Sequence, residues 1–311
     1  MQRHHDVRLA APKSKRKRLY NPLEGYWFVG LWIFGFMAFT LGPLLFSLII
    51  SFFQWDMIDA PKFVGVRNYF QMFTIDPLFW KSLRVTLVYS LLSVPLSLIL
   101  SLFLAMLLNI KIKGMGIFRT LFYLPSVITG VAIAVVWMWV YQPDFGILNY
   151  FLGFLGIHGI DWLGNPKIAI FSLIAVGVWG GSGTQIVIYL AGLQNISPQL
   201  YEAASIDGAT KFDQFWAVTL PMLSPTIFFN LIMGIIGAFR TFTQAYVMTN
   251  GGPSDSTMFY ALYLYNKAFR DMQMGYASGL SWILFIVIAC FTMLVFRTQR
   301  SWVYYESERR G

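Results

Sequence analysis

Long stretches without charged residues alternate with short polar segments along the chain. A helix needs roughly 20 apolar residues to cross the hydrocarbon core of a bilayer. Single spans must be helical, because lipid offers no hydrogen-bond partners to the backbone. Glycines in the fourth stretch and Arg240 in the fifth predict that these two spans are the less regular ones. The pattern predicts six transmembrane helices, near 26–53, 85–108, 120–141, 168–192, 223–247 and 277–296.

These spans divide the chain into four consecutive segments, and they predict an all-α polytopic membrane protein. The first segment is a basic tail, the second holds the first span and an external amphipathic piece, and the third is a core of five helices. The fourth is a short tail. The predicted bounds are 1–25, 26–84, 85–297 and 298–311, with a polar loop at 194–221 inside the core.

Composition and charge agree with this pattern. Hydrophobic residues make up 57% of the chain and charged residues 12%, against about 25% charged in a typical soluble domain. The net charge of +9 invites a nucleic-acid interpretation. However, no basic face is interleaved with the aromatic rings that stack on bases, so we expect no nucleic-acid partner. Instead, a basic cluster before the first span suits anionic membrane lipid: Lys13, Lys15, Arg16, Lys17 and Arg18.

The distribution of Lys and Arg predicts the orientation in the membrane. With the N-terminus inside, fifteen of these residues fall on the cytoplasmic side and eight on the outer side. Cytoplasmic loops carry the excess of positive charge in membrane proteins. We therefore expect a multi-pass protein of the bacterial plasma (inner) membrane with both termini in the cytoplasm.

The cytoplasmic loop 194–221 between the fourth and fifth spans has a readable local structure. Ser197 is a good helix N-cap, and Pro198 suits the first helical position. Asp207 and Gly208 then predict a sharp turn, because glycine tolerates the backbone angles that such a turn needs. The loop therefore begins with a short helix that ends at this turn.

A second short helix is expected from about Ala209 to Leu220, ended or bent by Pro221. Two helices at an angle would make a projection from the membrane, here called the knob (194–221). Small side chains on its first helix would let a partner's backbone approach, and Glu202 offers a charge to a basic partner residue. On these residues alone, an ordinary surface hairpin of helices is an equal alternative.

The knob carries the residues of a known motif. The run from Glu202 to Ala209, Glu-Ala-Ala-Ser-Ile-Asp-Gly-Ala, is followed by Leu220-Pro221 and resembles the EAA loop of ABC importer permeases. It is similar to the carbohydrate-uptake branch, which includes the maltose and glycerol-3-phosphate permeases. The run Thr249-Asn-Gly-Gly-Pro253 resembles the turn that those permeases carry after their fifth core helix. The resemblance covers roughly residues 20–300. It implies a type I ABC importer transmembrane domain that conducts a sugar, oligosaccharide or glycoside.

The same resemblance implies partners and a coupling role. In that family the knob docks in a groove of a separate ATP-hydrolysing subunit. The sequence lacks the Gly-x-x-x-x-Gly-Lys-Ser/Thr phosphate loop, so ATP and Mg are expected on partner subunits and no cofactor on this chain. The implied partners are a second homologous permease, two ATPase subunits and an extracytoplasmic solute-binding protein; a homodimer is the less usual alternative. The implied coupling residues are Glu202, Ala203, Ala204, Asp207 and Gly208.

Irregular helices near the midplane indicate where a solute passes through a transporter. Alignment with the maltose permease points to some of the same positions, but its asparagines are missing here, which argues against maltose itself. For each small residue, helix packing is the alternative role. Arg240 is expected to face the cavity or the partner permease, or to reach the outer membrane edge, because a central charge is costly. The predicted solute path comprises Gly181, Thr184, Gln185, Asn230, Gly234, Arg240, Thr241 and Gln244.

Two other classes of membrane protein fit the sequence less well. An ion-coupled secondary transporter needs carboxylates inside the membrane, and every Asp and Glu falls in a predicted loop, tail or span edge. A membrane-embedded enzyme needs a cluster of His, Asp, Glu or Cys, whereas Cys290 is the only cysteine and the three histidines are scattered. We therefore expect neither catalytic residues nor a metal site.

Overall fold

The chain forms two compact units that divide between Ile49 and Ile50, and each is considered by itself. The basic cluster predicted within the tail 1–25 lies outside the described residues, as does the end of the tail predicted for 298–311. The computed structural model describes residues 22–110, 112–157 and 159–304.

The first unit is helical. Helix α1 (Pro22–Phe36), a π-helical turn η1 (Met37–Leu41) and helix α2 (Gly42–Ile50) follow one another without a break. The π-helical turn ends two residues before Pro43, whose ring leaves no N–H for the helical ladder. Within it, Val29–Ile50 is long and apolar enough to cross a membrane. The first predicted span is therefore confirmed.

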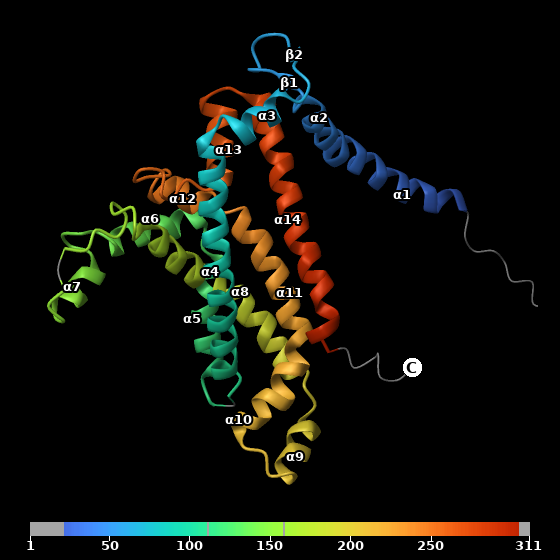
Figure 1. Ribbon diagram of the computed structural model, residues 1–311. Coiled ribbons are helices and arrows are strands. Elements are labelled where there is room, and N and C mark those ends of the chain that lie inside the picture. The colour runs from blue at the N-terminus through green and yellow to red at the C-terminus, as the bar shows by residue number, and fades with distance from the viewer. Residues whose placement is uncertain (1–21, 111, 158, 305–311) are drawn as a thin grey trace, which may run out of the picture. The chain divides into compact units, whose positions relative to one another are not determined.

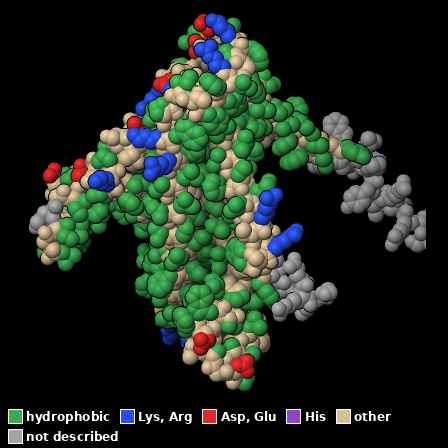
Figure 2. Space-filling view, viewed as in Figure 1, with side chains coloured by type: hydrophobic (Ala, Val, Ile, Leu, Met, Phe, Trp, Pro, Cys, Tyr) green, Lys and Arg blue, Asp and Glu red, His purple; other side chains and the backbone are tan. Residues whose placement is uncertain are grey.

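Long helices form the body of the second unit (Figure 1). In the described part they are α4 (Pro77–Leu108), α8 (Ala169–Gln194), α11 (Leu220–Phe239) and α14 (Met274–Trp302). Helix α4 packs against α8 and α11, and α11 also packs against α14. Their apolar side chains cover much of the outer surface, as Figure 2 shows for one face, whereas charged side chains gather toward the ends and on the arm that carries α7 (Ile147–Gly153).

Helix α4 begins at Pro77 instead of near residue 85. The cause is local: Asp76 caps the helix, with its Oδ1 accepting a hydrogen bond from the Leu78 N–H at 3.0 Å. Proline at the first helical position is preorganised for this start. At the other end of the chain, α14 continues to Trp302, into the predicted tail.

The third predicted span, 120–141, is a bent pair of helices instead of one straight helix. Helices α5 (Met115–Val127) and α6 (Gly130–Val140) meet at an angle of 101°. Ile128 and Thr129 between them are extended, with ψ near 140°. Average hydropathy does not register such a bend, because both arms are apolar. Within the described residues there are five membrane-spanning candidates, or six if the bent pair is one span.

The fourth span is regular, contrary to the prediction from its glycines. Helix α8 is unbroken, and two of its glycines serve close packing. A Cβ on Gly177 would lie 2.1 Å from the hydroxyl oxygen of Tyr89, and one on Gly183 would lie 2.9 Å from Oγ of Ser126. The glycines let α4 and α5 approach α8 without interrupting it.

The fifth span is irregular, as predicted. Helix α11 ends at Phe239, Arg240 forms its C-cap, and a short helix α12 (Thr243–Met248) follows after a two-residue break. The break places polar side chains at the end of α11, next to α6 and α8, both of which contact α12. This break shapes the site described below.

The end of the second unit opposite the knob holds short elements. A two-stranded antiparallel hairpin, β1 (Phe53–Gln54) and β2 (Lys62–Phe63), pairs Phe53 with Phe63. Helix α3 (Arg67–Thr74) follows, and its Asn68 donates hydrogen bonds to the carbonyls of Ser51 and Phe53. Strand β2, helix α3 and the first turns of α4 fall in the external amphipathic piece predicted before the core, whereas β1 lies at the end of the predicted first span.

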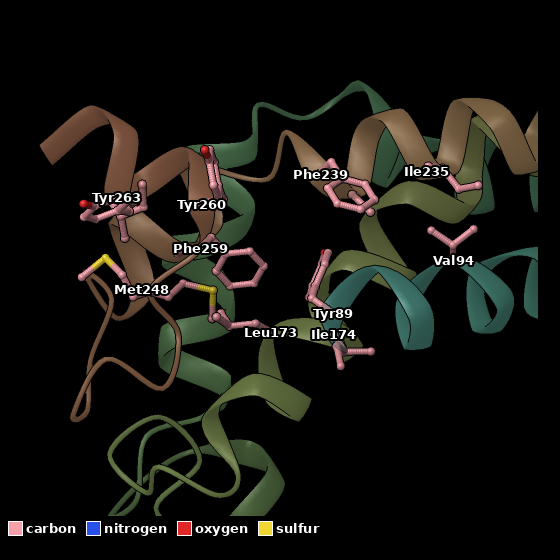
Figure 3. Packing of buried hydrophobic residues seen from close by; sticks show 14 of the residues in the cluster. Tyr89, Val94, Leu173, Ile174, Ile235, Phe239, Met248, Phe259, Tyr260 and Tyr263 are labelled. Atoms are coloured by element: carbon pink, nitrogen blue, oxygen red, sulfur yellow. The ribbon is translucent and has the colours of Figure 1, made fainter. Parts of the chain in front are cut away.

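The core of this unit lies among α4, α8, α11 and the segment α13 (Tyr260–Tyr265) with its π-helical turn η3 (Asn266–Arg270). In Figure 3, the ring of Tyr89 on α4 lies beside that of Phe259, with centroids 4.9 Å apart in an edge-to-face arrangement. Phe79 and Tyr260 pack similarly at 6.0 Å. These contacts hold the C-terminal third of the chain against α4.

Candidate functional site

A cavity of about 710 Å³, here called the central cavity, opens between α4, α6, α8, α11 and α12. Its volume is in the range of small-molecule sites. All eight residues predicted for the solute path line it, although they come from two spans and from the break after α11. They are Gly181, Thr184, Gln185, Asn230, Gly234, Arg240, Thr241 and Gln244. The structure thus brings the predicted residues together, while their role in transport stays a prediction.

Along α8, the cavity has open space next to one residue, Gly181, and is lined by one amide, that of Gln185, which hydrogen bonds hold in a fixed orientation. A Cβ on Gly181 would meet nothing within 4 Å, and Gly181 and Thr184 are exposed. Gln185 is half-buried, and its Oε1 accepts a hydrogen bond from Ser97 Oγ at 2.9 Å. Ser101 Oγ lies 3.0 Å from the same oxygen. Since Oε1 is engaged with α4, the NH₂ group of Gln185 is the part of the amide left to meet a ligand.

Sequence reasoning missed Ser97 and Ser101. Ser97 lines the cavity, Ser101 is fully buried, and both lie on the face of α4 that meets α8. A signal was present, because serines four residues apart share one face of a helix. Tyr89 and Ser93 on the same helix also line the cavity and were missed.

The wall formed by α11 holds a buried amide. Asn230 is 1% exposed, and within the described residues its Nδ2 has no hydrogen-bond partner. The neighbouring Tyr189 interacts with this side chain without reaching hydrogen-bond geometry. A Cβ on Gly234 would approach Val94 to 3.2 Å. Gly234 therefore lets α11 lie close to α4, and helix packing is part of its role.

The break after α11 and the first turn of α12 supply the remaining polar groups. Thr241 Oγ1 lies 3.4 Å from the Gly237 carbonyl. Gln244 donates from Nε2 to the carbonyl of Leu173 on α8, so its donor group is used within the fold and its oxygen is left for other partners. Phe242, one of the rings near the predicted path, lines the cavity and stacks on Tyr246. The Gln244 amide thus holds this segment to α8, and the Phe242 ring gives it an aromatic face.

Arg240 lies at the C-cap of α11, and its side chain is exposed and lines the cavity. The side chain thus lies at the cavity, which is one of the three placements predicted for it. No carboxylate within the described ranges forms an ion pair with it. It is the only charged residue among those that line the cavity in the described part of the chain.

The knob follows the prediction in its first half. Helix α9 (Pro198–Ile206) begins after Ser197 at the N-cap, and Gly208 turns the chain with φ of +80°. This is the left-handed region that side chains with a Cβ rarely adopt. The predicted coupling residues lie together here, with Ala204 half-buried and the others exposed: Glu202, Ala203, Asp207 and Gly208.

The second half of the knob differs from the prediction. The expected separate helix from Ala209 to Leu220 is instead α10 (Lys211–Gln214), followed by a π-helical turn η2 (Phe215–Thr219) that continues directly into α11. Thr210 and Asp213 form a capping box at the start. Pro221 does not end the helix. Its ring leaves no N–H to donate to the helix, and the wider π-helical turn just before it accommodates this missing donor. The knob is therefore joined to the cavity wall by one helical rod.

No group of three or more His, Cys, Asp or Glu side chains that could hold a metal ion occurs in the part of the chain that the structure describes. The cavity lining offers amide, hydroxyl and guanidinium groups together with aromatic rings. Such groups bind polar, hydroxylated ligands by hydrogen bonds.

Residues 97–301 match the family model described as "Binding-protein-dependent transport system inner membrane component". The chain belongs to this family. The matched residues include the knob and the helices that line most of the cavity, so the permease fold accounts for both features. The chain is accordingly a multi-pass inner-membrane protein of a binding-protein-dependent transport system.

Curated relatives resemble the permease over nearly their full length. It is 45% identical over 302 residues to the probable ABC transporter permease protein YesP of Bacillus subtilis (strain 168), which covers 96% of this chain and 97% of the relative. It is 36% identical to the lactose transport system permease protein LacF of Rhizobium radiobacter, covering 93% and 97%. It is 35% identical to the trehalose/maltose transport system permease protein MalF of Thermococcus litoralis, covering 85% and 89%.

Among solved structures, the permease is similar in fold to a chain of a bacterial alginate ABC transporter in complex with an alginate pentasaccharide-bound periplasmic protein. The TM-score is 0.78 at 21% sequence identity, covering 91% of this chain and 98% of that chain. At this identity the likeness concerns the fold. It agrees with the type I importer transmembrane domain that the EAA motif implies.

Proposed function

We propose that this permease forms half of the membrane path for a sugar, oligosaccharide or glycoside in an ATP-driven importer. The observation that carries the proposal is the collection of all eight predicted path residues around one cavity. Relatives named for lactose, trehalose/maltose and multiple sugar transport support the solute class. Hydroxylated solutes suit a lining of amides, hydroxyls and a flat ring such as Phe242.

The knob is the site of coupling in this proposal. Glu202, Ala203, Ala204, Asp207 and Gly208 would dock on a separate ATPase subunit, where ATP and Mg are bound. The exposure of all but Ala204 supports this role. The helical rod from α10 into α11 gives a direct mechanical connection, because a movement of the knob would shift the wall that holds Asn230.

The complete transporter in this proposal contains a second homologous permease, two ATPase subunits and an extracytoplasmic solute-binding protein. The positive charge distribution supports an orientation with both termini and the knob in the cytoplasm. The hairpin end of the second unit then faces the solute-binding protein. The apolar outer faces of the long helices contact lipid or the second permease.

The experiment compares coupling in the assembled transporter. The permease is purified with its ATPase, second permease and binding protein, and ATP hydrolysis in liposomes is measured with a panel of saccharides. Gly208→Trp is compared with Gly114→Trp, since both glycines have positive φ and open space at Cβ. We expect loaded binding protein to stimulate hydrolysis in the native protein and in Gly114→Trp, but not in Gly208→Trp. Equal behaviour of both variants would remove the coupling role from the knob, and solute uptake without ATP would indicate a secondary carrier.

A further inference from the structure

We propose that the solute of this permease carries an acidic group, a carboxylate or a sulfonate, and that Arg240 binds that group. The inference rests on the proposed function and gives its solute a chemical class, that of acidic saccharides. Three properties of the central cavity support it: its charge, the position of Arg240 along the path, and the hydrogen-bond donors left free beside it.

The only charge in the described lining of the cavity is positive. Across the described lining Arg240 is the only ionised side chain, and no Asp or Glu faces it from α4, α6, α8, α11 or α12. A guanidinium inside a membrane protein is costly unless it meets a counter-charge or water. Because Arg240 is exposed, water meets its charge when no solute is bound. A solute with an acidic group replaces that water by a counter-charge, whereas a neutral sugar does not. The planar guanidinium also matches a carboxylate with two parallel hydrogen bonds.

Arg240 stands at one end of the solute path. It caps α11 at the end away from the knob, whereas Asn230 lies deeper along the same helix. At a rise of about 1.5 Å per residue, the ten residues between them place their Cα atoms roughly 15 Å apart along the axis. This length leaves room for a saccharide whose acidic end meets Arg240 while its neutral part extends toward Asn230.

The remaining free groups include hydrogen-bond donors. Gln185 has its oxygen engaged by Ser97, which leaves its NH₂ group free. Asn230 is buried beside Tyr189, and its Nδ2 is covered by the protein. Hydroxyl, ring and carboxylate oxygens of a saccharide accept hydrogen bonds from such donors. A ligand rich in acceptors therefore suits the Gln185 side of the cavity.

The test uses the whole reconstituted transporter with its binding protein and two matched substrates, an oligosaccharide and its counterpart ending in a uronic acid. Arg240→Gln and Arg240→Lys are compared with Arg270→Gln. Arg270 donates to Asn250 and does not line the cavity, so its loss controls for a change in charge. Uptake and stimulated ATP hydrolysis are both recorded.

We expect the native protein to take up the acidic substrate. Arg240→Gln should reduce that uptake by about 10-fold or more, the loss typical of a hydrogen bond to a charged group. Arg240→Lys should retain part of it, and Arg270→Gln should behave as native. The yield and unfolding temperature of the assembled Arg240→Gln complex are measured as well, which separates lost recognition from lost folding.

Two results would overturn the inference. One is native uptake restricted to the neutral substrate, and the other is equal uptake of the acidic substrate by native protein and Arg240→Gln. In both, the importer function stands and only the solute class fails. If no saccharide stimulates hydrolysis in any variant, the proposed function fails first and the inference fails with it.

Discussion

Ser97 on α4 donates a hydrogen bond to Oε1 of Gln185 on α8, over 2.9 Å. This contact joins two neighbouring long helices at the wall of the central cavity. It also fixes which end of the Gln185 amide is engaged with α4, and it leaves the NH₂ group free. A polar contact between two spans thus serves the assembly of the helices and the chemistry of the cavity together.

The first prediction concerns these serines. In a Ser97→Ala, Ser101→Ala double variant, the Gln185 amide loses both partners and rotates freely, so we expect weaker solute interaction, with KM for uptake raised several-fold. The loss corresponds to about 1 kcal/mol per hydrogen bond. Ser90→Ala is the matched control, because Ser90 is buried on α4 and does not line the cavity. An unchanged KM in the double variant would mean that Gln185 does not meet the solute.

A second prediction separates lining from packing on α8. Gly181→Leu should fold normally and reduce uptake severely, because its side chain projects into open cavity space. Gly183→Leu should instead lower stability by about 1–3 kcal/mol, since its Cβ would already meet Ser126 at 2.9 Å. Thermal unfolding in detergent and uptake in liposomes distinguish the two. Normal uptake by Gly181→Leu would place the solute elsewhere.

The third prediction concerns pH and the end of the unit opposite the knob. Asp76 accepts hydrogen bonds from the Tyr263 and Tyr276 hydroxyls and from the Leu78 N–H. Burial opposes ionisation of this carboxyl, but the hydrogen bonds outweigh it and hold its pKa below the ordinary 3.8. The ionised group therefore stabilises the fold above its unfolded pKa, and this stabilisation is lost as pH falls through the folded pKa.

The measurement is the unfolding temperature of native protein and of Asp76→Asn, taken from neutral pH down through the folded pKa of Asp76. We expect the native protein to be the more stable at neutral pH and its advantage to shrink below a pH of about 4. Asp144→Asn is the control, because Asp144 is exposed and far less constrained. If the difference in unfolding temperature between native protein and Asp76→Asn stays constant with pH, the charge of Asp76 does not contribute to stability.

A fourth prediction tests the packing of the β-hairpin on α14. In Gly275→Ala, the new Cβ would lie 1.8 Å from the carbonyl oxygen of Phe53, which the backbone cannot accommodate in place. We expect a loss of several kcal/mol or failure to fold, since this clash involves main chain. Gly116→Ala on α5 has open space and should be neutral or slightly stabilising. Equal yields and unfolding temperatures for the two variants would contradict the close approach.

Much of the architecture could be read from the sequence. Five of the six predicted spans appear as long apolar helical stretches, because hydropathy over about 20 residues reflects a requirement of the membrane itself. The start of α9 after Ser197 and the turn at Gly208 were also predictable. The start follows from Pro198 at the first helical position, since the Ser197 side chain makes no capping hydrogen bond, and the turn follows from the freedom of glycine.

The candidate site was only half predictable. Polar residues and glycines in two spans pointed to the cavity, and the structure brings all eight together. Ser97 and Tyr89 were missed, because in an apolar helix the sequence does not show which face meets a cavity. The irregularity expected of α8 was wrong, since its glycines at 177 and 183 accommodate neighbouring helices instead of breaking their own.

By itself the sequence determined that the chain crosses a membrane several times and carries an exposed knob between its fourth and fifth spans. These properties depend on local composition and short motifs. The tertiary structure decided the 101° bend between α5 and α6, the rod through Pro221 and the place of Arg240 at the cavity. Each depends on contacts between residues far apart along the chain, and the packing of whole helices selects among local conformations that the sequence leaves open.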